Sequence, residues 1–172
     1  HYVSLEHLFI NLYKYIKQGI ENNQIIYISA YPQLYNKLIK KLIAAKIPQE
    51  FIRFHSVKEI ILNYKENKNY LSEFIIKHEQ LHPNYNGIKW IGQPTYAINQ
   101  TSKEDFLNFE KELTSAVKET NSSILCIYDF YEYLQGEALD DTIIKQSHLT
   151  HPYMLSEFKL TPTDKLFNTH CL

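Results

Sequence analysis

The sequence predicts an α/β domain of three layers, in which a mainly parallel sheet is flanked by helices on both faces. Short continuous apolar runs, such as 25–30 and 124–128, are typical of strands that a parallel sheet buries on both sides. Between these runs, longer segments repeat apolar residues at steps of three and four, as one face of a helix does. With 172 residues, 44% of them hydrophobic, the chain has the size of a single domain, which we expect to span residues 1–172.

The first quarter of the chain predicts a helix, a strand and a second helix. Apolar residues recur at helical spacing over 5–20, and Ser4 stands at the N-cap position. Gly19 is unfavourable inside this helix and indicates that the helix ends shortly before the strand at 25–29. A second helix is expected over 32–46, because a proline suits the first helical position.

The rest of the chain continues the alternation of strands and helices. Ser102, with Asp105 three residues later, is close to a capping box and opens a helix. Residues 60–62 predict a helix or a turn. The other expected elements are strands at 51–55, 88–92, 124–129 and 154–160 and helices at 70–81 and 136–146. Strands that alternate with helices of this length indicate a mainly parallel sheet.

Charge and composition exclude several classes of protein. Eighteen basic and nineteen acidic residues give a net charge of −1, and the lysines are dispersed, so we expect no direct nucleic-acid partner. The apolar runs are far shorter than the roughly 20 residues that cross a bilayer, so we expect no membrane span. The first residues lack the pattern of an export signal, and two cysteines make no disulfide framework. A cytoplasmic protein is therefore expected.

The glycines argue against a nucleotide hydrolase. A phosphate-binding loop needs glycines that let backbone N–H groups surround the phosphate. The four glycines are scattered, and neither Gly-x-x-x-x-Gly-Lys-Ser/Thr nor Gly-x-Gly-x-x-Gly occurs. Asp129 ends an apolar run, as a magnesium-binding aspartate of such hydrolases does. An enzyme with a degenerate nucleotide site is therefore one alternative.

A zinc site at His78 and His82 is a second enzyme alternative. Residues 78–82 match the His-Glu-x-x-His pattern, in which a helix brings two imidazoles to one metal ion and the glutamate acts as base. Pro83 follows at once, whereas that pattern needs a helix that continues, and no third ligand is marked. We favour a helix end that faces solvent.

Residues just after the predicted strands are the first candidates for a binding site, because ligands of doubly wound sheets gather at the carboxyl ends of the strands. These residues are Tyr31, His55, Gln93, Tyr96 and Asp129.

A cysteine and two histidines provide a further candidate. His148 and His151 are three residues apart, and Cys126 would lie near them if its strand is next to the following helix. A metal or redox site there is one alternative. A cysteine inside a strand is more commonly a small buried hydrophobe, so we expect no metal ion and no cofactor.

Several short motifs, in order and spacing, resemble those of the MEDS family, a sensory domain named from methanogens, methylotrophs and the dichloromethane-responsive regulator. The motifs are His1 followed by the helix 8–19 and the strand 25–29, Phe109-Glu110 with Leu113, Leu125-Cys126-Ile127-Tyr128-Asp129, and His151-Pro152. The chain departs from the family at Gln24, where the family has glutamate, and at Lys89, where it has arginine. The resemblance implies a P-loop-NTPase-like fold, related to RecA and the circadian-clock ATPases, whose phosphate loop has degenerated. It also implies sensing of small molecules, often hydrocarbon derivatives, in transcription regulation or two-component signalling.

We therefore predict a small-molecule sensory domain of a bacterial or archaeal regulatory system, without catalysis. A signalling protein is the expected partner, and a homodimer is left open. A protein-binding scaffold, which would expose a large apolar patch, is the remaining alternative. The residues expected to bind the ligand are Tyr31, Trp90, Tyr96, Cys126, Tyr128, Asp129, His148 and His151.

Overall fold

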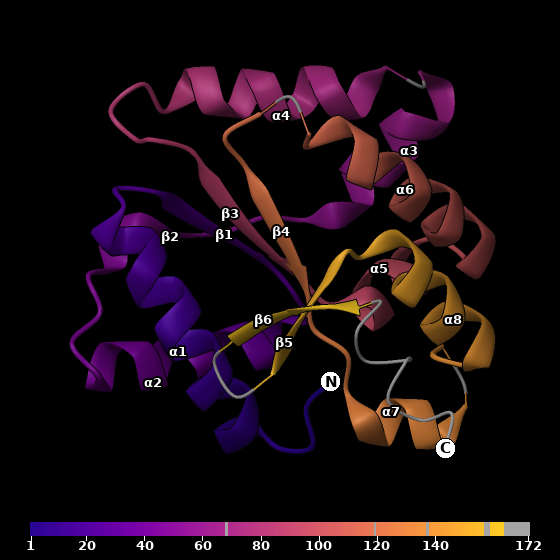
Figure 1. Ribbon diagram of the computed structural model, residues 1–172, viewed down its shortest axis with the longest axis horizontal. Coiled ribbons are helices and arrows are strands. Elements are labelled where there is room, and N and C mark those ends of the chain that lie inside the picture. Colours follow the sequence, from indigo (N-terminus) through magenta and orange to yellow (C-terminus); the bar gives the residue numbers. More distant parts are fainter. Residues whose placement is uncertain (68, 119, 137, 157–158, 164–172) are drawn as a thin grey trace.

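The computed structural model describes residues 1–67, 69–118, 120–136, 138–156 and 159–163 (Figure 1). The helices of these residues are α1 (Leu5–Glu21), α2 (Pro32–Ala44), α3 (Val57–Glu66), α4 (Tyr70–Leu81), α5 (Pro94–Gln100), α6 (Lys103–Ala116), α7 (Phe130–Gln135), α8 (Asp141–Thr150) and the short 3-10 helix η1 (Gln49–Phe51). The strands are β1 (Ile25–Ser29), β2 (Ile52–Phe54), β3 (Ile88–Gly92), β4 (Ser123–Cys126), β5 (Tyr153–Ser156) and β6 (Lys159–Pro162). No described helix is long and apolar enough to cross a membrane.

Four strands form a parallel sheet in the order β2-β1-β3-β4. The chain changes direction across the sheet between β1 and β3, which is the switch point of a doubly wound sheet. The register places Ser29, Gly92 and Cys126 side by side at the carboxyl ends of their strands. Helices cover both faces of the sheet (Figure 1). The predicted α/β class is confirmed.

Alternate side chains of the strands enter two separate cores. On one face, Ile26, Ile28 and Ile91 pack with leucines of α1 and α2. On the other face, Tyr27 and Trp90 pack with side chains of α3, α4, α5, α6 and α8. We call the first core the aliphatic face and the second the aromatic face. All five residues of β1 are buried, as its continuous apolar run predicted.

Side-chain caps explain where two of the helices begin. The hydroxyl of Ser4 accepts a hydrogen bond from the N–H of His7 at 3.1 Å, and the hydroxyl of Ser102 accepts one from the N–H of Asp105 at 3.0 Å. Each bond satisfies an N–H group that has no partner inside the first turn. Both predicted helix starts are confirmed.

Gly19 lies inside α1, which continues to Glu21, because the helix approaches the sheet closely at this point. A Cβ atom on residue 19 would lie 2.8 Å from the side chains of both Ile26 and Lys89. The glycine therefore lets α1 lie directly over the middle of the sheet.

The segment between β4 and α8 differs from the prediction. The strand expected over 124–129 ends at Cys126, because Asp129 instead caps α7 by accepting a hydrogen bond from the N–H of Tyr131. The helix expected over 136–146 is α8, which begins only at residue 141. Gly136 adopts a left-handed conformation that ends α7, and Asp140 then caps α8.

The last predicted strand is also different. Residues 154–160 were expected as one strand of the sheet, but β5 and β6 form a separate antiparallel hairpin in which Tyr153 pairs with Pro162. Residues 157–158 lie outside the described part of the chain. Two strands that are close in sequence pair antiparallel through a short connection, whereas joining the parallel sheet would need a longer crossover.

Candidate functional site

A cavity of about 540 Å³ lies beside β4, which is the edge strand of the sheet. Its walls come from α1, β4, the ends of α6 and α8, and β5. Leu8, Leu12 and Leu125 supply apolar wall, and Lys89 supplies a cation. A cavity of this size suits a small organic molecule, since small-molecule sites measure roughly 300–1,000 Å³.

Lys89 reaches this cavity from β3 although only 7% of the residue is exposed. Its Nζ atom lies 3.8 Å from the centre of the Tyr15 ring and donates a hydrogen bond to the Tyr15 carbonyl oxygen at 3.4 Å. Burial lowers the pKa of the Lys89 ammonium group, while the aromatic ring favours the charged form. The cation is therefore held in place by α1.

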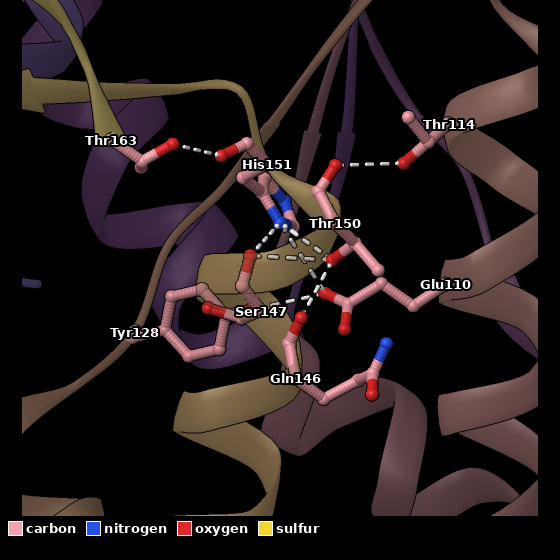
Figure 2. A network of polar contacts seen from close by, with 8 residues as sticks. All are labelled: Glu110, Thr114, Tyr128, Gln146, Ser147, Thr150, His151 and Thr163. Carbon is pink, nitrogen blue, oxygen red and sulfur yellow. Dashed lines mark hydrogen bonds and ion pairs between the residues drawn. The ribbon is translucent and has the colours of Figure 1, made fainter.

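Four of the residues predicted to bind a ligand line the cavity together: Cys126, Tyr128, His148 and His151. The carboxyl group of Glu110, from α6, lies beside Tyr128 and His151 (Figure 2). The Tyr128 hydroxyl donates a hydrogen bond to Oε1 of Glu110 at 2.9 Å, and Nδ1 of His151 lies 3.8 Å from the same oxygen. Glu110, Cys126 and His151 each offer a ligand atom, and these atoms lie within 4.8 Å of one another.

Glu110 is almost completely removed from water, with 2% of the residue exposed. Its Oε1 atom accepts the hydrogen bond from Tyr128, but its Oε2 atom is buried and has no hydrogen-bond partner in the described part of the chain. Burial raises the pKa of the carboxyl group to about 7, and the Tyr128 hydrogen bond opposes that shift. Near neutral pH, both protonation states of Glu110 are therefore populated, whereas an exposed glutamate is almost fully ionised.

Burial favours the neutral forms of the other ionisable groups of this cluster. Burial raises the pKa of the Cys126 thiol, and the neighbouring Glu110 carboxyl raises it further. Burial likewise lowers the pKa of His151. The contact between Glu110 and His151 is consequently not a strong ion pair near neutral pH.

His151 is held in position by the end of α8 and by the hairpin (Figure 2). Its Nδ1 atom lies 2.8 Å from the carbonyl oxygen of Ser147, and Nδ1 must donate because a carbonyl oxygen only accepts. The Thr163 hydroxyl donates to the carbonyl oxygen of His151 at 2.7 Å, and the Thr114 hydroxyl donates to that of Thr150 at 3.0 Å. These bonds connect the cavity wall to α6 and to Thr163, which directly follows β6.

The sequence model of one family matches residues 1–152 of the chain, and the family is described as the MEthanogen/methylotroph, DcmR Sensory domain, MEDS. The chain belongs to the MEDS family. The matched region contains the whole parallel sheet, α1 to α8, and the Glu110, Cys126 and His151 cluster. No curated protein matches this chain. No solved structure matches it either.

The other four predicted site residues of this MEDS domain lie elsewhere. Tyr31 and Tyr96 meet at the switch point, with ring centres 5.4 Å apart, and Trp90 stacks on Tyr27 inside the aromatic face. Asp129 caps α7. None of these four lines the cavity beside β4 within the part of the chain that the structure describes. The predicted set is therefore divided among four places: the cavity, the switch point, the start of α7 and the aromatic face.

The switch point of the sheet is filled by a polar network. The N–H of Tyr31 donates to the side-chain oxygen of Gln93 at 3.1 Å, and the Thr95 hydroxyl donates to Glu132 at 2.6 Å. Only Ala30 and Tyr31 connect β1 to α2, so this connection is too short to surround a phosphate group. The geometry agrees with the absence of a phosphate-binding motif.

The His-Glu-x-x-His segment does not form the metalloprotease arrangement. Helix α4 ends at Leu81, so His82 lies outside it and binds the Tyr27 hydroxyl through Nε2 at 2.7 Å. Nδ1 of His78 instead contacts the carbonyl oxygen of Phe74 at 2.9 Å, and Glu79 accepts a hydrogen bond from Ser122. Among the described residues, this segment supplies no group of three metal ligands.

Glu110 was not among the predicted site residues, although the sequence contains a signal for it. It lies four residues after Phe106 and three before Leu113, so it falls on the apolar stripe of the predicted helix. A carboxylate on the buried face of a helix is a candidate functional group, since such a group is costly to bury. His1 also lines the cavity, with its ring 5.5 Å from that of Tyr128, and no periodic pattern marks that residue.

Proposed function

We propose that this MEDS domain senses a small, mainly apolar molecule in the cavity beside β4. The observation that carries the proposal is that one cavity of suitable size gathers Cys126, Tyr128, His148 and His151. Most of its wall surface is apolar, as in small-molecule sites, and numerous polar side chains complete the wall. Membership of a sensory family supports the same conclusion.

The proposed signal passes through the carboxyl end of α8. The cavity wall includes Thr150, His151 and Tyr153, and hydrogen bonds join this segment to α6 and to Thr163. A molecule that binds better to one arrangement of this segment shifts the population towards that arrangement. A signalling protein that contacts α8 or the hairpin would detect the shift. The domain itself carries out no catalysis in this proposal.

A thermal-shift screen tests the proposal. Small alcohols, amines, halogenated hydrocarbons and ATP with magnesium are added separately, since a ligand that binds only the folded state raises the melting temperature. We expect an organic compound to raise it and ATP to leave it unchanged. A shift with ATP alone would instead favour the nucleotide-binding enzyme.

Asn11→Trp localises the binding. Asn11 lines the cavity from α1, and the larger side chain should fill part of the space and abolish the shift. The matched control is Lys17→Trp, at an exposed position of the same helix outside the cavity wall. This variant should still show the shift in melting temperature. A shift that survives in Asn11→Trp places the binding elsewhere and contradicts the proposal.

A further inference from the structure

The cluster of Glu110, Cys126 and His151 has the spacing of a metal site. Its three ligand atoms, a carboxylate oxygen, a thiol sulfur and an imidazole nitrogen, lie within 4.8 Å of one another. Two atoms bound to the same zinc ion at about 2.0–2.3 Å are separated by roughly 4 Å or less. Side-chain movements that include the ring of His151, so that its unprotonated nitrogen faces the cluster, would bring all three residues to one ion.

A buried atom of the cluster has no partner among the described residues. Oε2 of Glu110 forms no hydrogen bond with them, and the residue is only 2% exposed. A buried polar atom of this kind requires an explanation, because leaving it unpaired costs free energy. A cation bound at the cluster would satisfy that oxygen.

His151 already has the second hydrogen bond that metal-binding histidines usually make. Its Nδ1 atom, which lies 3.8 Å from Oε1 of Glu110, donates to the carbonyl oxygen of Ser147, so the lone pair that would bind an ion is on Nε2. Metal ligands of this type usually donate their other N–H to a carbonyl or a carboxylate, which fixes the tautomer and the orientation of the ring.

The charges of the cluster match a divalent cation. A thiolate and a carboxylate carry two negative charges, and the imidazole is neutral. Burial disfavours both anions in the absence of a cation, and a divalent ion would neutralise the pair. The neutral assembly then costs less to bury than either anion alone.

We propose that Glu110, Cys126 and His151 bind one zinc-class divalent ion, with a fourth coordination position that faces the cavity. Sulfur, nitrogen and oxygen ligands together suit Zn²⁺, and three protein ligands with one open position are the arrangement of zinc sites that accept an exogenous ligand. On binding, the S–H bond of Cys126 breaks, its electron pair forms the sulfur–metal bond, and the proton leaves to solvent. Any proton on Glu110 leaves in the same way, and no group is oxidised or reduced.

This inference deepens the proposed function by naming one polar contact of the sensed molecule. Cys126 and His151 line the cavity, so the fourth position would accept a water molecule or a donor atom of the ligand. The metal site itself does not depend on the proposed function. Only the identity of its fourth ligand rests on that function.

Cobalt substitution tests the site on the full chain. Tetrahedral Co²⁺ bound by a thiolate shows intense visible bands and a sulfur-to-cobalt charge-transfer band in the near ultraviolet. We expect these bands in the wild type, with one equivalent of Co²⁺, and their loss when Zn²⁺ is added. Cys126→Ser should abolish the charge-transfer band, whereas Cys171→Ser should keep it.

The other two ligands are tested by affinity. Glu110→Gln and His151→Ala should each weaken Zn²⁺ binding by more than about tenfold, because even groups that only support a ligand contribute that much. Glu112→Gln, at an exposed position of the same helix, and His78→Ala should leave the affinity unchanged. If Cys126→Ser does not fold, zinc X-ray absorption of the wild type decides, and it should show one sulfur ligand.

Absence of a charge-transfer band in the wild type, a band that requires Cys171 instead of Cys126, or a zinc site without sulfur would overturn the metal proposal. Those results would not decide the sensory proposal, which the thermal-shift screen with organic compounds tests separately. Conversely, a confirmed metal site with no melting shift from any compound, with or without Zn²⁺, would support the metal site and contradict the sensory proposal.

Discussion

The two faces of the sheet share the same strands but differ in the chemistry that they bury. Under α1 and α2, the aliphatic face packs Ile26, Ile28 and Ile91, and each is at most 1% exposed. The aromatic face stacks Tyr27 on Trp90 with ring centres 4.6 Å apart and adds histidines and a glutamate. The aliphatic face therefore contributes mainly stability, whereas the aromatic face also holds groups that are costly to bury.

The buried polar atoms follow the same division. Among the described residues, the two buried side-chain atoms without a hydrogen-bond partner are Nε1 of Trp90 and Oε2 of Glu110, and both residues belong to the aromatic side of the sheet. They line a small apolar cavity of about 70 Å³, which Cys126 also borders. Native proteins often hold such unfavourable groups at functional sites and compensate for them elsewhere. The comparison predicts that substitutions on the two faces affect different properties.

The largest effect is expected from Ile28→Ala on the aliphatic face. Ile28 is fully buried, so the substitution leaves a cavity and should lower the free energy of unfolding by about 2–5 kcal/mol. Urea denaturation measures the change. Ile10→Ala on the exposed side of α1, where the residue is 51% exposed, is the control and should change it by less than about 1 kcal/mol. Equal losses of unfolding free energy in Ile28→Ala and Ile10→Ala would contradict the conclusion that the aliphatic face contributes mainly stability.

On the aromatic side, Glu110→Gln is expected to stabilise the metal-free protein. At pH 8 the substitution removes a buried carboxylate that has an unpaired oxygen, and the free energy of unfolding should rise by about 1–3 kcal/mol. Glu112→Gln on the same helix should have almost no effect, because that residue is exposed. A loss of stability in Glu110→Gln would show that the carboxylate stabilises the fold and would remove this difference between the faces.

A smaller loss is expected from Tyr27→Phe. The substitution keeps the ring stacked on Trp90 but deletes the hydroxyl that binds Nε2 of His82 at 2.7 Å, which should cost about 1 kcal/mol in chemical denaturation. Tyr133→Phe deletes an exposed hydrogen bond to Asp141 and is the matched control, with a smaller expected loss. If both variants lose the same free energy of unfolding, burial on the aromatic face does not strengthen the hydrogen bond between Tyr27 and His82.

The smallest effect is expected from acid, because the three histidines involved are only partly buried. Burial lowers the pKa values of His55, His78 and His82 below the ordinary value of 6.5. Below pH 6.5 the unfolded chain therefore takes up protons at these three residues that the folded protein does not, so their contribution to the free energy of unfolding falls as the pH falls towards the lowered values. Glu110, whose pKa is raised to about 7, contributes in the opposite direction over the same range. Above pH 6.5 these histidines contribute no pH dependence.

His78→Phe tests this pH dependence, because it removes one of the three titrating rings from the aromatic face. As the pH is lowered from 7 to about 5, the free energy of unfolding of this variant should rise relative to that of the wild type. His7→Phe, at an exposed position of α1, is the control. An unchanged slope in His78→Phe would show that the acid sensitivity arises outside the aromatic face.

Most of the sheet could be predicted from the sequence because its signals are local. Apolar runs gave β1 and β3, and the caps at Ser4 and Ser102 marked two helix starts. The carboxyl-terminal hairpin could not be predicted in the same way, because residues 154–160 carry a strand pattern that does not specify a partner. Whether a strand joins a sheet or folds back on its neighbour depends on contacts distant in sequence.

The candidate site was predicted in part. Proximity to the predicted strand ends and histidine spacing identified Cys126, His148 and His151, which the fold brings together. The same reasoning selected Tyr31, whose position at a strand end is correct but which lies at the switch point instead of the cavity. Position along a strand places a residue at one edge of the sheet, but it does not say which strands are neighbours there.

The sequence by itself determined the α/β class, the order of most elements and the absence of a phosphate-binding loop, since periodicity, caps and glycine positions act over a few residues. Only the tertiary structure decided that Glu110 meets Cys126 and His151, because α6, β4 and α8 are far apart in the sequence. Their meeting depends on how helices pack against the edge strand. The burial that shifts the pKa of Glu110 to about 7 arises from that packing alone, since the same glutamate in an isolated helix would be in water.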